Sequence, residues 1–323
     1  MNFKDQTILI TGGAQGIGLS LSKKFSSIGA NVIIADKDRQ TPDIAARIGV
    51  FGYVCDVTIE QEINNFITFA EEKFGQVDCF ISNAGMIFVD PSHVASASNT
   101  NWELSWRLHV MQHVFAARRL LPGMLKRKYG YLVNTASAAG LLYQIGDAPY
   151  SASKAAAEEF CVAYENTYKL PIYITHTMNV FGERQHPEKF IPMVIQRVRD
   201  GQKVFVHSNE EKTLAGSRHY IHAQDVADGL MFILNLKNYK HRGDFGNASC
   251  PKFNLVGPEE IDNLTLAQSI AKIQNKDLIY ELIDNHSSRP GHDLRYSLDP
   301  GLLKSLGWEP KIKLTKRIEE VVN

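Results

Sequence analysis

The sequence predicts an α/β fold, with a parallel, doubly wound sheet and a smaller C-terminal lobe. Short apolar runs rich in β-branched residues alternate with helical patterns as far as residue 178. Such strict alternation indicates a parallel sheet, because parallel neighbours are joined by crossover helices. Beyond residue 178 the alternation breaks down, which indicates a second lobe built from sequence that leaves and rejoins the sheet.

Each element follows from its own pattern. The brief β-branched runs predict strands at Thr7–Ile10, Val32–Ala35, Phe51–Val54, Cys79–Ser82, Tyr131–Asn134 and Ile172–Thr177. Helical patterns lie between them, at 17–28, 41–48, 60–74, 101–128 and 150–168. Further on, we expect helices at 187–200, 223–236, 264–274 and 314–322, and strands near 204–206, 218–221, 253–255 and 279–282. The predicted nucleotide-binding domain is 1–178 with about 219–256, and the predicted lobe is about 179–218 with 257–323.

Composition excludes several classes of function. The 35 basic and 35 acidic side chains cancel, so no global field attracts nucleic acid or an anionic membrane. Four scattered cysteines (Cys55, Cys79, Cys161 and Cys250) form no CxxC pair, which predicts reduced thiols and no metal site. No apolar run approaches the roughly 20 residues that cross a bilayer. The first residues lead straight into a strand, so we expect no signal peptide and a cytoplasmic protein.

A glycine-rich turn joins the first strand to its helix. Residues 11–18 read TGGAQGIG, in which Gly12, Gly16 and Gly18 permit a tight turn and close approach of the backbone to a pyrophosphate. Gln15 and Ile17 belong to the same predicted cofactor site. Asp36 ends the second strand, where a carboxylate accepts hydrogen bonds from ribose hydroxyls and repels a 2′-phosphate, favouring NAD over NADP. The plainer alternative is that Asp36 only begins a solvated turn with Asp38.

Two further motifs complete a family pattern. Asp56 and Val57 follow the third strand, and Asn83, Ala84 and Gly85 follow the fourth. With the glycine turn, these motifs resemble the short-chain dehydrogenase/reductase superfamily in order and spacing, over residues 1 to about 157. The resemblance implies a Rossmann sheet that binds NAD. It also implies that Asp56 and Val57 lie near the adenine, and that residues 83–85 lie beside the cofactor.

Ser137, Tyr150 and Lys154 match the catalytic set of that superfamily. Tyr150 and Lys154 are four residues apart, so on a helix they share a face. A tyrosine has a pKa near 10, but a nearby ammonium and the positive nicotinamide favour its phenolate. Tyr150 would exchange a proton with a substrate oxygen that Ser137 orients. Lys154 would also hold the nicotinamide ribose. The plainer alternative is a surface YxxxK helix pair.

One residue of the predicted helix 101–128 departs from the family pattern. His109 stands where single-domain members usually carry an asparagine that supports a water relay behind the lysine. His109 could substitute for it or be a satisfied core histidine, and the sequence favours neither. Trp102, Trp106 and Phe115 recur at helical spacing, which is more typical of a core or a dimer interface than of ligand contacts.

The C-terminal half resembles a different branch of the superfamily. Asn179-Val180-Phe181-Gly182, residues 186–192 (HPEKFIP), residues 218–222 (RHYIH), residues 289–296 (RPGHDLRY) and residues 306–310 (LGWEP) are similar to dTDP-glucose 4,6-dehydratases, over about 158–323. That resemblance implies a nucleotide-diphosphate sugar held by Asn179, Glu188, Lys189, Arg218, Arg289, His292 and Tyr296. Guanidinium groups suit a diphosphate, because their planar fork binds phosphate oxygens bidentately.

The two halves disagree about dehydration. The dehydratase family places an Asp-Glu pair directly after the hydroxyl residue, whereas Ser137 is followed by Ala138 and Ala139. Asp147 is the nearest acidic residue before Tyr150, at a different loop position. The segment between Ser137 and Tyr150 is also short, as in single-domain members. The chain therefore has the pattern of a hybrid, joined near residues 154–158.

We expect an NAD-dependent oxidoreductase or epimerase that acts at C4 of a nucleotide-diphosphate hexose, with a deoxythymidine or uridine base. Three alternatives remain: a dTDP-glucose 4,6-dehydratase-like enzyme, a simple NAD-dependent alcohol dehydrogenase or ketoreductase, and a non-catalytic binder of NAD or sugar nucleotide. Helices 101–128 and 150–168 would form the face through which this superfamily usually makes homodimers.

Overall fold

In the computed structural model, five of the six expected N-terminal strands form one parallel sheet. They are β1 (Thr7–Thr11), β2 (Asn31–Asp36), β3 (Phe51–Val54), β4 (Cys79–Ser82) and β5 (Tyr131–Asn134). Their order in the sheet is β3-β2-β1-β4-β5. The order reverses between β1 and β4, which is the point where open α/β sheets of this kind bind ligands.

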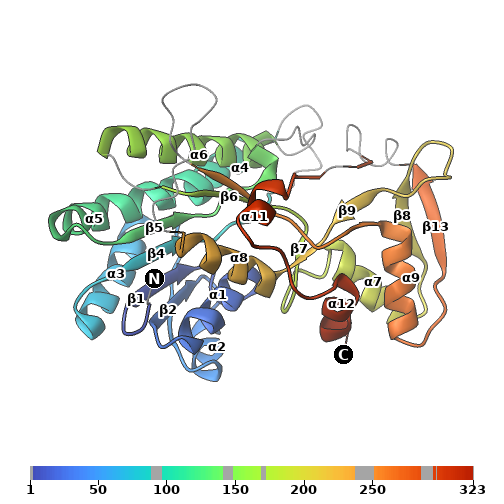
Figure 1. The fold of residues 1–323 in the computed structure, drawn as a ribbon, viewed down its shortest axis with the longest axis horizontal. Helices are drawn as coiled ribbons and strands as arrows, with labels where there is room; N and C mark the ends of the chain where they lie inside the picture. The colour runs from blue at the N-terminus through green and yellow to red at the C-terminus, as the bar shows by residue number, and fades with distance from the viewer. Residues whose placement is uncertain are drawn as a thin grey trace. The chain divides into compact units, whose positions relative to one another are not determined.

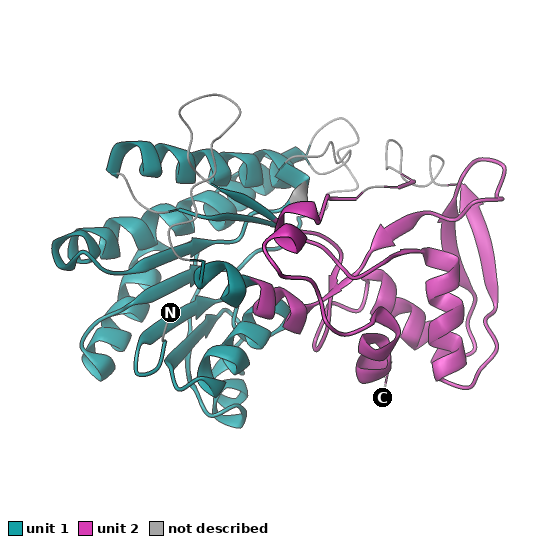
Figure 2. Cartoon of the chain, viewed as in Figure 1, with its two compact units in different colours: residues 1–143, 147–176, 230–253 teal, residues 144–146, 177–229, 254–323 magenta. Residues whose placement is uncertain are grey.

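The structure describes residues 3–88, 97–140, 148–168, 172–236, 251–284, 294–295 and 297–322. Their contacts divide the chain into two compact units (Figure 2). The first holds residues 1–143, 147–176 and 230–253, and the second holds residues 144–146, 177–229 and 254–323. Residues 219–229, which we expected in the nucleotide-binding domain, have their contacts in the second unit.

The sixth strand, β6 (Ile174–Thr177), continues the direction of the sheet through a parallel bridge between Thr135 and Thr175. It pairs with β11 (Lys252–Leu255), the strand in which the chain leaves the first unit again after residue 253. The Ile174 N–H donates to the Pro251 carbonyl over 2.9 Å. The first unit thus combines the N-terminal part of the chain with the later segment 230–253.

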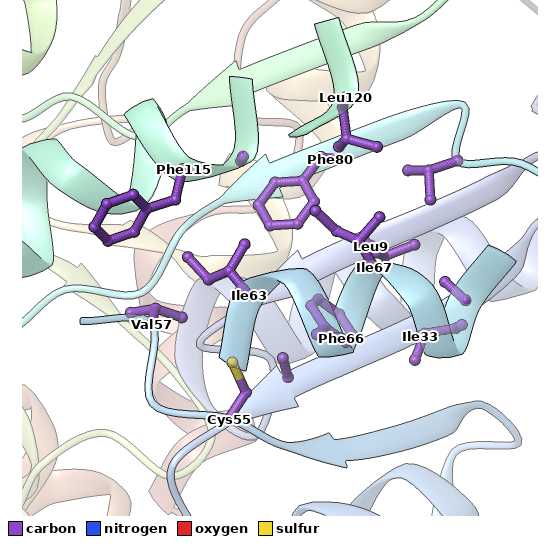
Figure 3. Packing of buried hydrophobic residues seen from close by; sticks show 14 of the residues in the cluster. Leu9, Ile33, Cys55, Val57, Ile63, Phe66, Ile67, Phe80, Phe115 and Leu120 are labelled. Atoms are coloured by element: carbon purple, nitrogen blue, oxygen red, sulfur yellow. The ribbon is translucent and has the colours of Figure 1, made fainter. Parts of the chain in front are cut away.

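Helices cover both faces of the sheet (Figure 1). α1 (Gly16–Ser27) and α2 (Thr41–Arg47) pack on one face, and α3 (Glu60–Phe74) and α5 (Gln112–Arg127) pack on the other. Figure 3 shows Ile63, Phe66 and Ile67 of α3 facing the sheet residues Leu9 and Ile33. Because both faces are covered, β1, β2 and β4 are apolar without alternation, as buried parallel strands are.

The predicted helix 101–128 is interrupted. α4 (Asn99–Trp106) leads into a π-helical turn at Arg107–Met111, and α5 follows directly. A π turn adds one residue to a helical turn and commonly marks a functional site. Phe115 is buried in the core cluster that also contains residues of α3, whereas Trp106 is 46% exposed. α6 (Ala148–Tyr168) then follows the 3-10 turn η2 (Ala138–Gly140).

The second unit has its own apolar core. Three strand pairs build it: β7 (Val180–Phe181) with β10 (Ile221–His222), β9 (Ser217–His219) with β12 (Glu260–Asp262), and β8 (Val204–Ser208) with β13 (Tyr280–Asp284). α7 (Phe190–Arg199), α9 (Asn263–Ile273) and α12 (Leu314–Val322) pack around them, with α11 (Gly301–Ser305) between β13 and α12 in the sequence.

α8 (Ala223–Leu234) begins in the second unit and ends in the first. At Gly229 the helix backbone lies against Leu255 and Trp308, so close that an added Cβ would be 2.4 Å from Leu255 Cδ2. This packing explains why residues 219–229 group with the second unit. No described helix of either unit is long and apolar enough to cross a membrane.

Candidate active site

The glycine turn has a geometry that only glycine permits. Gly12 and Gly16 have φ angles of 62° and 53°, in the left-handed region. A Cβ on Gly18 would lie 2.1 Å from the Gly12 carbonyl oxygen, and a Cβ on Gly12 would lie 2.8 Å from Ala84 Cα. Nothing lies within 4 Å of the Cβ position of Gly16. The turn therefore brings three backbone segments together and leaves open space at the start of α1.

α1 begins without a side-chain cap. Gln15 is its N-cap residue and makes no side-chain hydrogen bond to the helix, so the first amides, including that of Ile17, are not satisfied by a capping side chain. Uncapped amides and the positive end of the helix dipole make such a terminus a binding site for an anion. A pyrophosphate is the anion for which the glycine turn makes room.

Asp36 is tied to this turn. Its Oδ2 accepts a hydrogen bond from the Ala14 N–H over 3.3 Å, and its Oδ1 accepts one from the Asp38 N–H over 3.3 Å. Asp36 therefore begins the turn with Asp38 and also lies beside the glycine turn, and its contact with ribose stays a prediction.

Asp56 orders the turn between β3 and α3. Its Oδ1 accepts hydrogen bonds from the Thr58 N–H at 2.9 Å and from the Thr58 hydroxyl at 2.7 Å. The Asp56 N–H donates in return to Glu62 over 2.6 Å. Val57 is buried in the core. Both residues thus shape the end of β3, and a contact with adenine stays a prediction.

The end of β4 is fastened to the end of β1. Asn83 Nδ2 donates to the Thr11 and Gly12 carbonyls over 3.1 and 3.3 Å. The N–H groups of Asn83 and Ala84 donate to the Thr11 hydroxyl oxygen over 3.0 and 3.1 Å. Gln112 Nε2 donates to the Ala84 carbonyl over 2.7 Å. Asn83 and Ala84 therefore hold the glycine turn in place.

Lys154 places a buried amino group next to Tyr150. Only 4% of the residue is exposed, and Nζ donates to the Thr135 carbonyl over 2.8 Å. Burial lowers the pKa of Lys154 to about 8. Nζ lies 5.8 Å from the centroid of the Tyr150 ring, so the two side chains share one face of α6 as their spacing predicts.

Ser137 lies in a turn that packs on the same helix. Its Oγ accepts a hydrogen bond from the Ala139 N–H over 3.2 Å, which leaves the hydroxyl proton to be donated elsewhere. A Cβ on Gly140 would lie 3.1 Å from the Ala155 backbone nitrogen and 3.2 Å from the Lys154 carbonyl carbon. The turn after Ser137 therefore meets α6 at Lys154 and Ala155.

His109 projects from the π turn into this centre. Its ring is fully buried and meets the Tyr150 ring edge to face, with centroids 5.0 Å apart. Its Nδ1 lies 2.9 Å from the Ser153 hydroxyl oxygen. Burial, and then the charge of Lys154, lower the pKa of His109 to about 3, against weaker opposition from the Met86 and Ser105 backbones. His109 is therefore neutral at physiological pH.

The predicted sugar-binding residues fall on the second unit. Asn179 has a φ of 49°, and its Nδ2 donates to the His219 carbonyl over 3.2 Å. Glu188 is exposed, and Lys189 is the N-cap residue of α7. Arg218 Nη1 donates to the Ser217 and Leu294 carbonyls over 2.6 and 2.7 Å. Arg289, His292 and Tyr296 lie outside the described residues.

Four contributors were not singled out from the sequence. Thr11 and Gln112 fasten the glycine turn, the Thr135 carbonyl receives Lys154, and Ser153 contacts His109. Thr11 opens the TGGAQGIG motif and Ser153 lies inside the YSASK motif, so a signal existed for those two. Within the described residues, no group of three or more His, Cys, Asp or Glu side chains could hold a metal.

Comparison with known families separates the chain into the same two parts as its sequence motifs do. A family model for short chain dehydrogenases matches residues 6–175, and one for GDP-mannose 4,6 dehydratases matches residues 142–321. Each match covers more than half of the chain. The two matches overlap over residues 142–175, which include the expected junction near 154–158.

Individual relatives give the same picture. The low-salt glycan biosynthesis protein Agl12 of Haloferax volcanii is 34% identical over 54% of this chain and 51% of its own length. A probable dTDP-glucose 4,6-dehydratase of Sinorhizobium fredii is 28% identical over 98% of this chain and 91% of its own length. For most of the other relatives, the match spans about half or less of the relative's length.

Solved structures share the whole fold. The UDP-glucose 4-epimerase of Thermus thermophilus, solved in complex with NAD, superposes with a TM-score of 0.73 over 98% of both chains. Its sequence is 19% identical, so this likeness concerns the fold alone. The expected Rossmann-type α/β fold with a C-terminal lobe is thereby confirmed.

Proposed function

Because the chain belongs to the short chain dehydrogenase family over its N-terminal half and to the GDP-mannose 4,6 dehydratase family over its C-terminal half, we propose that it is an NAD-dependent enzyme acting at C4 of a nucleotide-diphosphate hexose. The observation that carries the proposal is the convergence of Tyr150, Lys154 and the Ser137 turn on α6, in the unit that also holds the glycine turn.

The first unit has the features that NAD requires. The glycine turn brings backbone where a Cβ on Gly12 or Gly18 would collide, α1 offers uncapped amides, and Asp36 supplies a carboxylate at the end of β2. Gly12, Gln15, Gly16, Ile17 and Gly18 would hold the pyrophosphate, and Asp36 the adenosine ribose. When bound, the nicotinamide accepts and returns a hydride.

The side chains of the centre handle the proton. Tyr150 takes the proton of the sugar 4-hydroxyl during oxidation and returns it during reduction. The Lys154 ammonium favours the phenolate form of Tyr150, because the two opposite charges attract at short range. Ser137 donates its hydroxyl proton to the same substrate oxygen and so fixes its orientation.

We propose epimerisation at C4 as the net reaction, through a 4-keto sugar that is reduced on its other face. Epimerisation needs only the proton and hydride steps, for which Ser137, Tyr150 and Lys154 suffice. Dehydration is the second candidate, because the similar protein of Sinorhizobium fredii is a probable 4,6-dehydratase. It needs an additional acid and base, and Ala138 and Ala139 stand where the dehydratase family carries its Asp-Glu pair.

The second unit would supply the nucleotide-sugar contacts. Asn179, Glu188, Lys189 and Arg218 are the described candidates, with Arg289, His292 and Tyr296 proposed from the sequence alone. The substrate class is that of the relatives and solved structures, whose names include dTDP-glucose and UDP-glucose. We also propose a cytoplasmic homodimer formed through α4, α5 and α6.

The test is product analysis by mass spectrometry, together with NADH absorbance, using dTDP-glucose and UDP-glucose. An isomer of unchanged mass, separable by chromatography, supports epimerisation, and loss of one water supports dehydration instead. Net accumulation of NADH with an oxidised sugar supports a simple dehydrogenase. Binding of both ligands without turnover supports a non-catalytic binder.

A Tyr150→Phe variant separates catalysis from binding. It should lose about 100-fold or more in rate, because general acid–base catalysis contributes at least that much. Binding of NAD, measured by calorimetry, should be retained. Equal turnover by Tyr150→Phe and the natural chain would overturn the assignment of Tyr150 as the proton-transfer residue.

A further inference from the structure

Ser153 determines which nitrogen of His109 carries the proton. The Ser153 hydroxyl lies 2.8 Å from the Tyr150 carbonyl and 2.9 Å from His109 Nδ1. A hydroxyl has one proton to donate, and a carbonyl oxygen can only accept. If Ser153 donates to the Tyr150 carbonyl, its oxygen must accept from His109, so Nδ1 carries the imidazole proton. In this neutral ring, Nε2 is then unprotonated and carries a lone pair.

His109 Nε2 lies in a small space next to Lys154. Nε2 is buried and meets the geometry of a hydrogen bond with no described residue, although the Met86 and Ser105 backbones lie near the ring and oppose the fall in the pKa of His109. A Cβ on Gly85 would lie 3.6 Å from His109 Nε2 and 3.7 Å from Lys154 Nζ, so both atoms border the same point. A buried acceptor beside a buried ammonium is a favourable arrangement, whereas two buried donors there would repel each other.

We propose that Ser153 and His109 form a positioning pair for Tyr150 and Lys154. Ser153 holds His109 in the Nδ1–H tautomer, the His109 ring packs against the Tyr150 ring, and the Nε2 lone pair is directed across Gly85 to the side of Lys154. The pair touches neither substrate nor cofactor in this scheme. It acts by orienting the two side chains that do, and in that respect the inference rests on the proposed function.

Two observations support the pair independently of the hydrogen bonds. The edge-to-face contact of the rings, with an interplanar angle of 89°, requires the His109 ring to keep one orientation. The π turn at Arg107–Met111 displaces His109 from regular α-helical register, and such turns persist where a particular side chain must be placed. The charge of Lys154 also disfavours the protonated form of His109 and so lowers the pKa of His109, as expected for two neighbouring side chains.

The test is the tautomer of His109, read from ¹⁵N chemical shifts of histidine-labelled protein without ligands. The His109 signals are assigned by their loss in His109→Gln. We expect protonated Nδ1 and unprotonated Nε2, and we expect Ser153→Ala to disturb this pattern and Ser153→Thr to restore it. Ser105→Ala is the matched control, because Ser105 is buried one turn before His109 and its hydroxyl has no partner among the described residues.

An Nε2–H tautomer, in which His109 donates towards the Met86 backbone, would overturn the inference. So would a response of the His109 signals to Ser105→Ala as large as the response to Ser153→Ala. Because these readouts need no substrate, they remain decisive if neither sugar nucleotide is converted, in which case the proposed function alone has failed.

Kinetics of the same variants test the positioning role. Ser153→Ala should lower kcat by about 10-fold with KM little changed, since small misplacements of reacting groups cost between one and two orders of magnitude in rate. Ser153→Thr should recover most of the loss, and Ser105→Ala should match the natural chain. Gly85→Ala adds a methyl at ordinary contact distance from both nitrogens and should also lower kcat. Unchanged kcat in both Ser153→Ala and Gly85→Ala contradicts the positioning role.

Discussion

At the scale of single residues, Lys154 combines a charge with almost complete burial. Its ammonium donates to the Thr135 carbonyl, but burial still lowers its pKa to about 8 from the ordinary value of 10.5. The same group therefore has opposite effects on stability and on catalysis. Its charge costs folding free energy, while the proposed chemistry needs that charge to favour the Tyr150 phenolate.

The pH dependence of the enzyme should show this opposition. Between about pH 8 and 10.5 the unfolded chain binds a proton at Lys154 that the folded chain has released, so this group makes stability rise with pH. Activity should fall over the same range, because the ammonium is lost with an apparent pKa near 8. The measurements are kcat/KM and the urea midpoint as functions of pH. Lys154→Met should remove activity and abolish the rise of stability with pH. If Lys154→Met keeps that rise, Lys154 is not the group that causes it.

The glycine turn allows a second prediction at this scale. Gly18→Ala places a methyl 2.1 Å from the Gly12 carbonyl oxygen, so the turn must move and NAD binding should fall at least 10-fold. Gly49→Ala is the matched control, because Gly49 lies outside the glycine turn and its added methyl would meet nothing within 4 Å. Its φ of 71° should cost about 1 kcal/mol of stability without a change in NAD affinity. Calorimetric titration with NAD checks both variants, and equal affinities would contradict the close packing of this turn.

At the scale of elements, a buried ion cluster fastens α6 to the sheet. Glu158 lies one helical turn after Lys154 and is 5% exposed. Its carboxylate accepts hydrogen bonds from His176 Nε2 of β6, at 2.8 Å, and from Lys252 Nζ of β11. Burial would raise the pKa of Glu158, but the two hydrogen bonds outweigh it and lower the pKa. Helix α6 is thus attached to β6 and β11, two strands that lie far apart in the sequence.

Removing different members of this cluster should have unequal effects. Glu158→Leu leaves His176 without its carboxylate and should destabilise the fold by about 3 kcal/mol, the usual cost of breaking a buried pair. Lys252→Met should cost about 1 kcal/mol or less, because the Lys252 side chain is 47% exposed and its charge is screened. Urea unfolding of both variants gives the comparison. Equal losses would mean that the exposed lysine, and not the buried Glu158–His176 contact, holds the helix.

The predictability of these elements depends on how local their causes are. The parallel sheet, the glycine turn and the shared face of Tyr150 and Lys154 follow from short patterns, and the structure has them. The π turn around His109 was not predicted, because one extra residue hardly alters the periodicity of a long helix. The His176 and Lys252 partners of Glu158 were equally invisible, since they lie 18 and 94 residues away in the sequence.

At the scale of the whole molecule, α6 carries a row of aromatic side chains between Tyr150 and its C-terminal end. Phe160, Tyr164 and Tyr168 follow one another at intervals of four residues, with ring centroids 4.3 and 5.3 Å apart. Phe160 packs partly against the core, whereas Tyr168 is 47% exposed. A row of aromatic rings that ends in an exposed tyrosine is typical of an interface, because such rings bury a large area at little entropic cost.

The proposed homodimer predicts that this row controls the oligomeric state. A variant with both Tyr164→Glu and Tyr168→Glu introduces four like charges into a symmetric interface of two chains, since each substitution occurs twice. Desolvation and repulsion of these charges should dissociate the dimer at micromolar concentration. Light scattering after gel filtration should give twice the chain mass for the natural protein and the single chain mass for the variant.

Phe205→Glu serves as the control, because Phe205 is an exposed aromatic residue on β8 of the other unit, with 43% of its surface accessible. It should leave the mass unchanged. A natural protein that is monomeric, or a double variant that remains dimeric, would contradict the role of α6. Dissociation by Phe205→Glu alone would place the interface on the second unit instead. Because α6 also carries Tyr150 and Lys154, loss of the dimer should lower activity as well. High protein concentration should restore that activity only in a variant that weakens association without abolishing it.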